Sequence, residues 1–189
     1  PAEKLSEQLK SLGLKIGRLK TGTTPRLDGR TINFDKLEPQ PGDEKIRKFS
    51  FWPSEIKMPQ VPCYITYTNQ NTHQVIMDNI KKSAMYSGAI TGVGARYCPS
   101  IEDKVSRFPD KDRHQVFIEP TSLKSYEYYP NGISTSLPLD VQIQYLRSME
   151  GLENVDVVRA GYAIEYDYVI PTQLKSTLEL KDINGLYCG

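Results

Sequence analysis

Residues 61–68 are VPCYITYT and residues 72–84 are THQVIMDNIKKSA, and this succession decides the class of fold. In the first stretch, β-branched and aromatic residues alternate with other residues, which predicts a strand. In the second stretch, apolar residues recur with the 3.6-residue period of a helix. A strand followed directly by a helix favours an α/β fold.

Periodic patterns extend from this stretch towards the N-terminus. Leu5, Leu9 and Leu12 share one face of a helix that we expect from Ala2 to Leu12, and residues 14–22, LKIGRLKTG, predict a strand. The next segment, from Thr23 to Met58, is rich in proline, glycine and charge. We expect it to form a long surface loop with a short extended piece at its RKFSFW sequence.

Further elements are expected towards the C-terminus. Residues 103–108 and 114–120 are typical of paired strands, and residues 138–149, PLDVQIQYLRSM, predict a helix with proline near its first turn. Residues 155–170 predict one or two strands. The last seven residues, INGLYCG, resemble the start of a buried strand, so we expect a sheet that is completed elsewhere and a chain that is incomplete at both ends.

Composition limits the functions to consider. Hydrophobic residues make up 38% of the 189 residues, enough to build a core. Lys and Arg number 24 against 23 Asp and Glu, so the net charge of +1 gives no reason to expect that the chain as a whole attracts nucleic acid. Any nucleic-acid site must be a local basic patch. No run approaches the roughly 18 apolar residues of a membrane span, and the first ten residues, PAEKLSEQLK, lack the apolar core of a signal peptide. We expect a cytoplasmic protein with no membrane contact.

Three cysteines, Cys63, Cys98 and Cys188, lie at irregular spacings that fit neither a zinc site nor a disulfide scaffold. Reduced thiols and no metal are therefore expected. Cys63 shares the phase of Val61 and Ile65 on its predicted strand, and Cys188 lies among apolar residues, so both are expected in the core. Cys98 differs because it follows a glycine-rich loop.

Cations surround Cys98 in the sequence. A thiol becomes a nucleophile when its thiolate is stabilised, and Arg96, Lys104 and Arg107 supply positive charge for this. The alternative is a small packed side chain whose cationic neighbours are cancelled by the acids at 102–103. The glycines of the preceding loop could cradle a phosphate with their amides, but they do not complete a G-x-G-x-x-G fingerprint. A flexible loop is the alternative reading.

A basic segment lies nearer the N-terminus, where Arg18, Lys20, Arg26 and Arg30 are opposed by a single acid, Asp28. Arginine and lysine supply the charge for phosphate contacts, so this segment predicts nucleic-acid binding. The alternatives are a solvated basic loop, or pairing of the first two cations with carboxylates or with a flavin pyrophosphate.

Other polar and aromatic residues carry weaker signals. Tyr126, Tyr128 and Tyr129 could stack on bases, but alternating aromatic residues also build cores. His73 and His114 have no metal-ligand neighbours in the sequence, so we assign both to surface or packing roles.

Five blocks of the chain together carry a family resemblance. Residues 17–26 (GRLKTGTTPR), 61–66 (VPCYIT), 94–105 (GARYCPSIEDKV), 129–138 (YPNGISTSLP) and 160–168 (AGYAIEYDY) resemble successive signature blocks of the MnmG/GidA family, in the same order and with similar spacing. The resemblance covers essentially the whole chain.

The resemblance implies part of a flavoprotein with two Rossmann-like dinucleotide-binding regions for FAD and NAD, a mixed sheet and long loops. Residues 1–22 would end an FAD-domain segment or form a linker, residues 23–137 would form an inserted NAD-binding region, and residues 138–189 would return to the FAD-binding domain. Such a protein adds an aminomethyl or carboxymethylaminomethyl group to C5 of the wobble uridine of tRNA. It uses FAD, NADH and a one-carbon unit from methylenetetrahydrofolate.

The resemblance also implies partners and site residues. The partners are tRNA and an MnmE-type GTPase, with a homodimer that forms a heterotetramer with the GTPase in a bacterial cytoplasm rather than in mitochondria. Cys98 matches one of two cysteines associated with catalysis. The NAD-binding segment matches Gly94, Ala95, Arg96, Tyr97, Cys98, Pro99, Ser100, Ile101, Glu102, Asp103, Lys104, Val105, Ser106, Arg107 and Phe108.

The FAD fingerprint glycines of the family are absent from this sequence, so we expect the chain alone not to be a competent enzyme. Two other functions remain open at this point. One is a related folate- and FAD-dependent tRNA uridine methyltransferase, although blocks 94–105 and 129–138 favour MnmG/GidA. The other is a non-catalytic module that binds NADH, tRNA or the GTPase.

Overall fold

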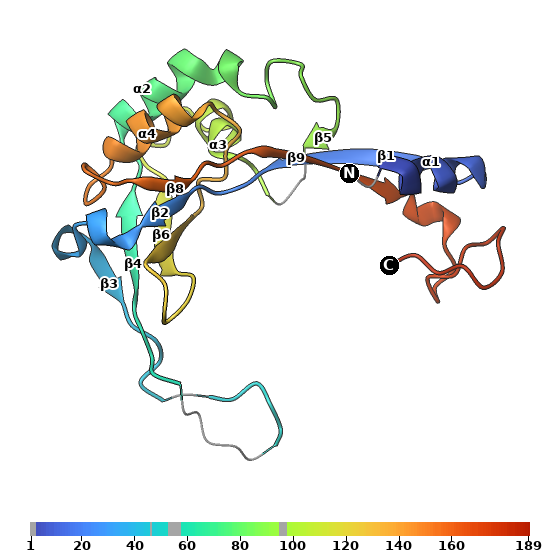
Figure 1. The fold of residues 1–189 in the computed structure, drawn as a ribbon, viewed down its shortest axis with the longest axis horizontal. Coiled ribbons are helices and arrows are strands. Elements are labelled where there is room, and N and C mark those ends of the chain that lie inside the picture. Colours follow the sequence, from blue (N-terminus) through green and yellow to red (C-terminus); the bar gives the residue numbers. More distant parts are fainter. Residues whose placement is uncertain (1–2, 46, 53–57, 95–97) are drawn as a thin grey trace.

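The computed structural model describes residues 3–45, 47–52, 58–94 and 98–189. Helices and strands alternate along these residues and form two sheets, which confirms the predicted α/β class (Figure 1). The strands are β1 (Ile16–Gly22), β2 (Arg26–Asp28), β3 (Glu38–Gln40), β4 (Cys63–Tyr67), β5 (Val93–Gly94), β6 (Gln115–Pro120), β7 (Glu127–Asn131), β8 (Val157–Arg159) and β9 (Ala163–Val169). The helices are α1 (Glu3–Ser11), α2 (Gln70–Asn79), α3 (Ile101–Arg107) and α4 (Leu139–Arg147), with short 3-10 turns η1 (Gly29–Thr31), η2 (Phe34–Lys36), η3 (Ile80–Lys82) and η4 (Pro171–Gln173).

The smaller sheet has the strand order β5-β1-β9. Strand β1 runs antiparallel to β9, from Ile16 opposite Val169 to Gly22 opposite Ala163, and parallel to β5. This combination of pairings confirms the predicted mixed sheet. Figure 1 shows β1 and β9 as a long ribbon that extends from the larger part of the molecule towards α1.

The larger sheet has the order β3-β4-β6-β7-β2-β8, and all its neighbouring strands are antiparallel. Helices α2, α3 and α4 gather on one side of it, and α2 contacts both of the others (Figure 1). Fully buried side chains fill the space between the sheet and the helices, because removing apolar surface from water stabilises the folded state by roughly 25 cal/mol per Å². They include Leu27, Ile76, Ile101, Val116, Ile118, Ile133, Tyr145, Leu146, Met149, Leu152 and Val155.

The prediction of a surface loop over Thr23 to Met58 is wrong for its first half. Strand β2 lies inside the larger sheet between β7 and β8, and its Leu27 is fully buried. Strand β3 pairs with β4 at the edge. The described residues between β3 and β4 do extend away from the sheet (Figure 1), but residues 47–52 form no strand.

Three further predictions are wrong. Residues 103–108 belong to helix α3 rather than to a strand, because Ser100 and Asp103 form a capping box that starts a helix. Residues 183–189 form no strand, and only Tyr187 makes an isolated bridge, with Glu179. Cys63 and Cys188 are half-buried rather than core residues.

The domain boundaries implied by the resemblance stay a prediction. Within the described residues, α4 packs against α2 and β8 pairs with β2, so both lie in the unit built on the larger sheet. No helix in the described part of the chain has the length and apolar character needed to cross a membrane.

Candidate active site at Cys98

Cys98 is exposed and lies three positions before Ile101, the first residue of helix α3. It lines a cavity of about 230 Å³ at the place where β1 of the smaller sheet approaches α3 and the segment after α2. The lining residues are Lys20, Thr21, Met85, Tyr86, Gly94, Cys98, Asp103 and Arg107. The cavity therefore combines a thiol with cations, a hydroxyl and a carboxylate.

Strand β1 brings two polar side chains to the cavity. The Thr21 Oγ1 lies 3.6 Å from the Sγ of Cys98, and the Nζ of Lys20 donates to the carbonyl oxygen of Met85 at 2.9 Å. A close approach of the backbones holds β1 beside the glycine-rich loop. A Cβ added to Gly92 would lie 2.9 Å from the carbonyl carbon of Leu19, so only glycine fits there.

Helix α3 fixes the other side of the cavity. The Ser100 hydroxyl accepts from the amide of Asp103 at 3.1 Å, and the Asp103 carboxylate accepts from the amide of Ser100 at 3.2 Å. The amide of Ile101 donates to the carbonyl of Ser134 at 2.7 Å, and the Ile101 side chain is fully buried. These contacts anchor the start of α3 and, with it, the loop that carries Cys98.

Charged groups of both signs face the cavity. Asp103 accepts from the Tyr86 hydroxyl at 2.8 Å and lies 3.3 Å from the guanidinium of Arg107. Burial is the main cause that raises the pKa of Tyr86. Burial also lowers the pKa of Lys104, and the negative charge of a nearby Cys98 thiolate opposes this shift.

Only some of the described residues between Gly94 and Phe108 line the cavity. Gly94, Cys98, Asp103 and Arg107 line the cavity, whereas Ala95, Arg96 and Tyr97 lie outside the described residues. The remaining described members have other roles. Ile101, Glu102 and Val105 are buried, Ser100 caps the helix, and Phe108 is exposed. Hydrogen bonds link Lys104 to the carbonyl of Gly132, the carbonyl of Pro99 to the hydroxyl of Ser134, and Ser106 to Tyr86.

The glycine-rich loop binds an internal carboxylate. The amides of Thr91 and Gly92 both donate to Oε1 of Glu165, each at 2.9 Å. These two amides are therefore engaged within the chain, and the assignment of NADH to the segment from Gly94 to Phe108 stays a prediction.

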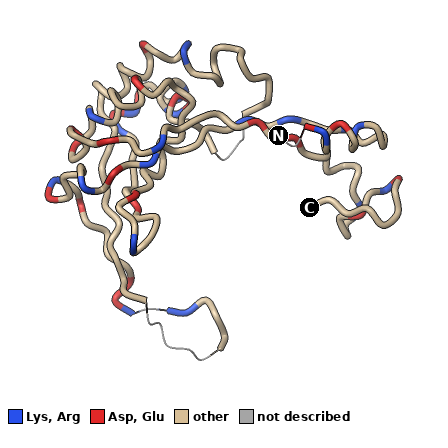
Figure 2. The backbone as a smooth tube through the Cα atoms, viewed as in Figure 1, with Lys and Arg blue, Asp and Glu red and all other residues tan. Residues whose placement is uncertain are grey.

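The four residues of the basic segment are separated by the fold. Arg18 and Lys20 lie on β1, Arg26 lies on β2, and Arg30 lies in η1. Each has a partner within the chain. Their partners are Asp167 and Glu165 for Arg18, the Met85 carbonyl for Lys20, Glu127 and the Tyr129 ring for Arg26, and Asp28 and the Tyr126 ring for Arg30. Acids from distant segments thus offset the charges of Arg18 and Arg26, and Asp28 offsets that of Arg30. Figure 2 shows Lys, Arg, Asp and Glu interleaved along β1 and β9.

Sequence reasoning missed part of the site. Met85 and Tyr86 follow α2 and carry no motif, so no pattern in the sequence marks them as neighbours of Cys98. Lys20 was predicted to contact nucleic acid, yet it lines the cavity of the thiol. The sequence pattern of residues 14–22 predicts a strand that contains Lys20 and Thr21, but it does not predict which loop this strand will contact.

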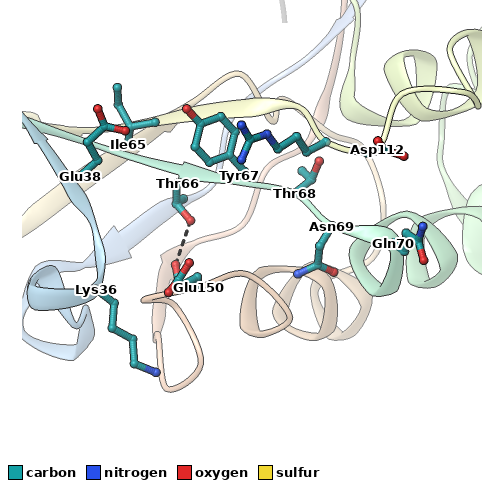
Figure 3. Close-up of a pocket in the computed structure, with 11 residues that line it drawn as sticks. Lys36, Glu38, Ile65, Thr66, Tyr67, Thr68, Asn69, Gln70, Asp112 and Glu150 are labelled. Carbon is teal, nitrogen blue, oxygen red and sulfur yellow. Dashed lines mark hydrogen bonds between the residues drawn. The ribbon is translucent and has the colours of Figure 1, made fainter.

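A second, more open cavity of about 470 Å³ lies along β4 (Figure 3). Its lining residues are Lys36, Glu38, Ile65, Thr66, Tyr67, Thr68, Asn69, Gln70, Asp112, Arg113 and Glu150. The Arg113 guanidinium stacks 4.1 Å from the centre of the Tyr67 ring, and the Thr66 hydroxyl donates to the carbonyl of Glu150 at 2.8 Å. None of the residues that we singled out as site candidates lines this cavity.

Comparison with known proteins identifies the family. The family model described as glucose inhibited division protein A matches residues 1–189. The chain is 59% and 60% identical, over 187 residues each, to proteins named tRNA uridine 5-carboxymethylaminomethyl modification enzyme MnmG from Thermodesulfovibrio yellowstonii and Pelobacter propionicus. Both alignments cover 99% of this chain and 30% of the relative, so the chain spans about a third of the length of these curated relatives.

A solved structure also matches this chain. The structure of Aquifex aeolicus GidA in its form I crystal matches with a TM-score of 0.86 and 51% sequence identity, over 96% of this chain and 31% of that chain. At this identity the likeness extends beyond the fold. The chain belongs to the glucose inhibited division protein A (GidA) family, whose model it matches from end to end.

Proposed function

We propose that this chain supplies the reactive thiol of an enzyme that adds an aminomethyl or carboxymethylaminomethyl group to C5 of the wobble uridine of tRNA. The observation that carries the proposal is the exposed Cys98, which shares a cavity with Lys20 and Thr21. The names of the relatives, which are tRNA uridine modification enzymes, supply the substrate class.

The chemistry of uracil explains why a thiol is needed. C5 of the ring is a poor nucleophile until a group adds to C6. When the Cys98 thiolate forms a bond to C6, the C5–C6 π electrons move towards the C4 carbonyl and produce an enolate whose C5 attacks the one-carbon electrophile. A base then removes the C5 proton, the S–C6 bond breaks, and both the ring and the thiolate are restored. Alternatively, Cys98 handles the C5 proton as an acid or base.

The cofactors and partners of the whole protein follow from the same proposal. FAD and NADH would supply redox chemistry and methylenetetrahydrofolate the one-carbon unit, with an MnmE-type GTPase acting on a homodimer in the bacterial cytoplasm. Most of the cofactor contacts would come from regions of the relatives that this chain does not cover, since the chain spans about 30% of their length.

The basic segment would contribute to tRNA binding. Arg30 and Tyr126 support this role, because both side chains are about two-thirds exposed and the guanidinium lies 5.1 Å from the ring centre. When an arginine lies over a tyrosine ring, the arginine offers charge to a phosphate, and the ring offers a flat surface to a neighbouring base. Arg18, Lys20 and Arg26 are more strongly engaged within the chain, so their contribution would be smaller.

The decisive test is Cys98→Ser in the full-length protein. We expect modified wobble uridine to disappear from tRNA, measured by nucleoside mass spectrometry, because a serine hydroxyl does not ionise near neutral pH. Bound FAD, measured by absorbance, and the circular dichroism spectrum should not change. Cys63→Ser is the matched control, since Cys63 is half-buried on β4 and lies outside the cavity. Wild-type modification in Cys98→Ser would reject the proposal.

A further inference from the structure

Glu102 is adjacent in sequence to the cavity residue Asp103, but its side chain is fully buried. Its Oε1 accepts hydrogen bonds from the hydroxyl of Ser83 and from the amide of Ser136, both at 3.0 Å. Its Oε2 has no hydrogen-bond partner among the described residues. Burying a carboxylate is costly, so its presence here calls for a role beyond packing.

The two serines connect Glu102 to the backbone around Met85. Their hydroxyl oxygens lie 2.6 Å apart. Since the Ser83 hydroxyl proton is donated to Glu102, the Ser136 hydroxyl donates to Ser83 and accepts from the amide of Met85 at 3.2 Å. The amide of Ala84 also donates to the carbonyl of Ser136, at 3.3 Å. The position of the Met85 backbone therefore depends on Ser136, and the position of Ser136 depends on Glu102.

Met85 in turn holds a cation. Its carbonyl oxygen accepts from the Nζ of Lys20 at 2.9 Å, and both residues line the cavity that contains Cys98. We infer that Glu102 is a positioning residue that, through Ser136 and the Met85 carbonyl, keeps the ammonium group of Lys20 in the cavity that contains the thiol. The inference rests on the proposed function, because only a reactive Cys98 makes this charge matter for catalysis. The charge near the thiol can nevertheless be measured without an activity assay.

The charge can be measured with two alkylating reagents. Iodoacetate is an anion and iodoacetamide is neutral, so the ratio of their rates at Cys98 reports the positive charge near the thiol. The rates are followed on the Cys98 peptide of the full-length protein by mass spectrometry, so that Cys63 and Cys188 do not contribute. General loosening of the structure raises the iodoacetamide rate, whereas loss of a positive charge lowers the iodoacetate rate and leaves the iodoacetamide rate nearly unchanged, which separates a positioning role from a merely structural one.

Four variants test the chain of contacts. Lys20→Met should lower the ratio by about threefold, the effect of removing one partly screened charge from the same cavity. Glu102→Leu and Ser136→Ala should lower it by a similar factor, and Glu102→Gln should restore it because the amide oxygen can accept the same two hydrogen bonds. Ser148→Ala is the matched control, since Ser148 bonds to Thr72 at 2.7 Å and lies outside the cavity.

A double variant makes the test specific. If Glu102 acts through Lys20, adding Glu102→Leu to Lys20→Met should lower the ratio no further. An unchanged ratio in Lys20→Met, or in both Glu102→Leu and Ser136→Ala, would overturn the inference. A ratio in the double variant that falls below that of Lys20→Met alone would overturn it too. If Glu102→Leu does not fold, Ser136→Ala and Glu102→Gln decide the outcome. Normal tRNA modification by Cys98→Ser would remove the proposed function but would not alter these ratios.

Discussion

Thr21 and Cys98 are 77 positions apart in the chain, yet the hydroxyl of Thr21 lies 3.6 Å from the sulfur of Cys98. Thr21 belongs to β1 of the smaller sheet, and Cys98 precedes α3, which packs with the larger sheet. The thiol environment is therefore built where the two sheets meet, and a displacement of either one would alter it.

The Thr21 hydroxyl should support the reactivity of the thiol. A hydrogen bond to an ionised group contributes about 1.5–3 kcal/mol, so removing this donor with Thr21→Val should slow iodoacetamide alkylation of Cys98 by roughly tenfold. Thr21→Ser keeps the donor and should retain most of the rate. Equal rates in Thr21→Val and the unmodified protein would show that the 3.6 Å contact does not act on the thiolate.

The role of Cys98 as nucleophile or as acid and base can be separated with a substrate analogue. If the thiolate adds to C6, tRNA with 5-fluorouridine at the wobble position should remain covalently attached, because fluorine at C5 cannot leave as a proton does. The adduct should appear as a shift in mass on the Cys98 peptide. Turnover of normal tRNA without any adduct from the fluorinated tRNA would favour the acid and base role.

A buried histidine should make stability depend on pH. The rings of His73 and His114 lie 5.3 Å apart, and Thr68 contacts both residues. Burial, with a smaller contribution from the charge of His73, lowers the pKa of His114 from 6.5 to about 4. Between these two values the unfolded chain binds a proton that the folded chain does not, so the free energy of unfolding should fall as the pH decreases from 6.5 towards 4.

The slope for this histidine should remain below the limit of about 1.4 kcal/mol per pH unit for one group, because the folded and unfolded states differ by less than one full proton at each pH in this range. Urea unfolding at several pH values measures it. His114→Phe should flatten the dependence, whereas His73→Phe should have the smaller effect, since burial lowers the pKa of His73 less strongly. A pH dependence that is identical in His114→Phe would assign it to other groups.

The sequence predicts the elements whose pattern is local. Strand β4, helix α2 and helix α4 were expected within a few residues of their observed bounds, because each has a clear period. Strand β2 was missed because it has three residues, of which only Leu27 is buried. Its pairing with β7 and β8 depends on residues about 100 or more positions away, and no local pattern contains that information.

The site shows the same division. Cys98 could be identified from its sequence neighbours, but the approach of β1 to the thiol is a long-range contact. Glu102 was expected to modulate the charge near Cys98, whereas it is buried and bonded to two serines. Helix α3 is a different case, because the Ser100 and Asp103 pair is a capping signal that the sequence does contain and that outweighs the strand-like appearance of residues 103–108.

The capping box of α3 should contribute measurably to stability. Ser100→Ala removes the acceptor for the amide of Asp103 and should lower the free energy of unfolding by about 1 kcal/mol. Ser122→Ala is a suitable control, because its hydroxyl accepts from the Lys124 amide in an exposed turn and its loss should cost less than about 0.5 kcal/mol. Equal effects in the two variants, measured by urea unfolding, would mean that the cap does not stabilise α3.

The last prediction concerns the contribution of Arg30 to tRNA binding. Arg30 pairs with Asp28 but remains about two-thirds exposed, so a phosphate can compete for its guanidinium, whereas Arg26 is only about one-quarter exposed beneath the Tyr129 ring. Arg30→Ala should weaken binding of all tRNAs alike and lower the slope of log affinity against log salt by about one unit, and Arg26→Ala should change the slope less. Lys175→Ala is the matched control, because Lys175 forms a similar exposed ion pair with Glu179. Bound FAD is quantified by absorbance in the same samples of full-length protein. A normal slope combined with loss of FAD in Arg30→Ala would mean that the segment supports the flavin site instead of the tRNA.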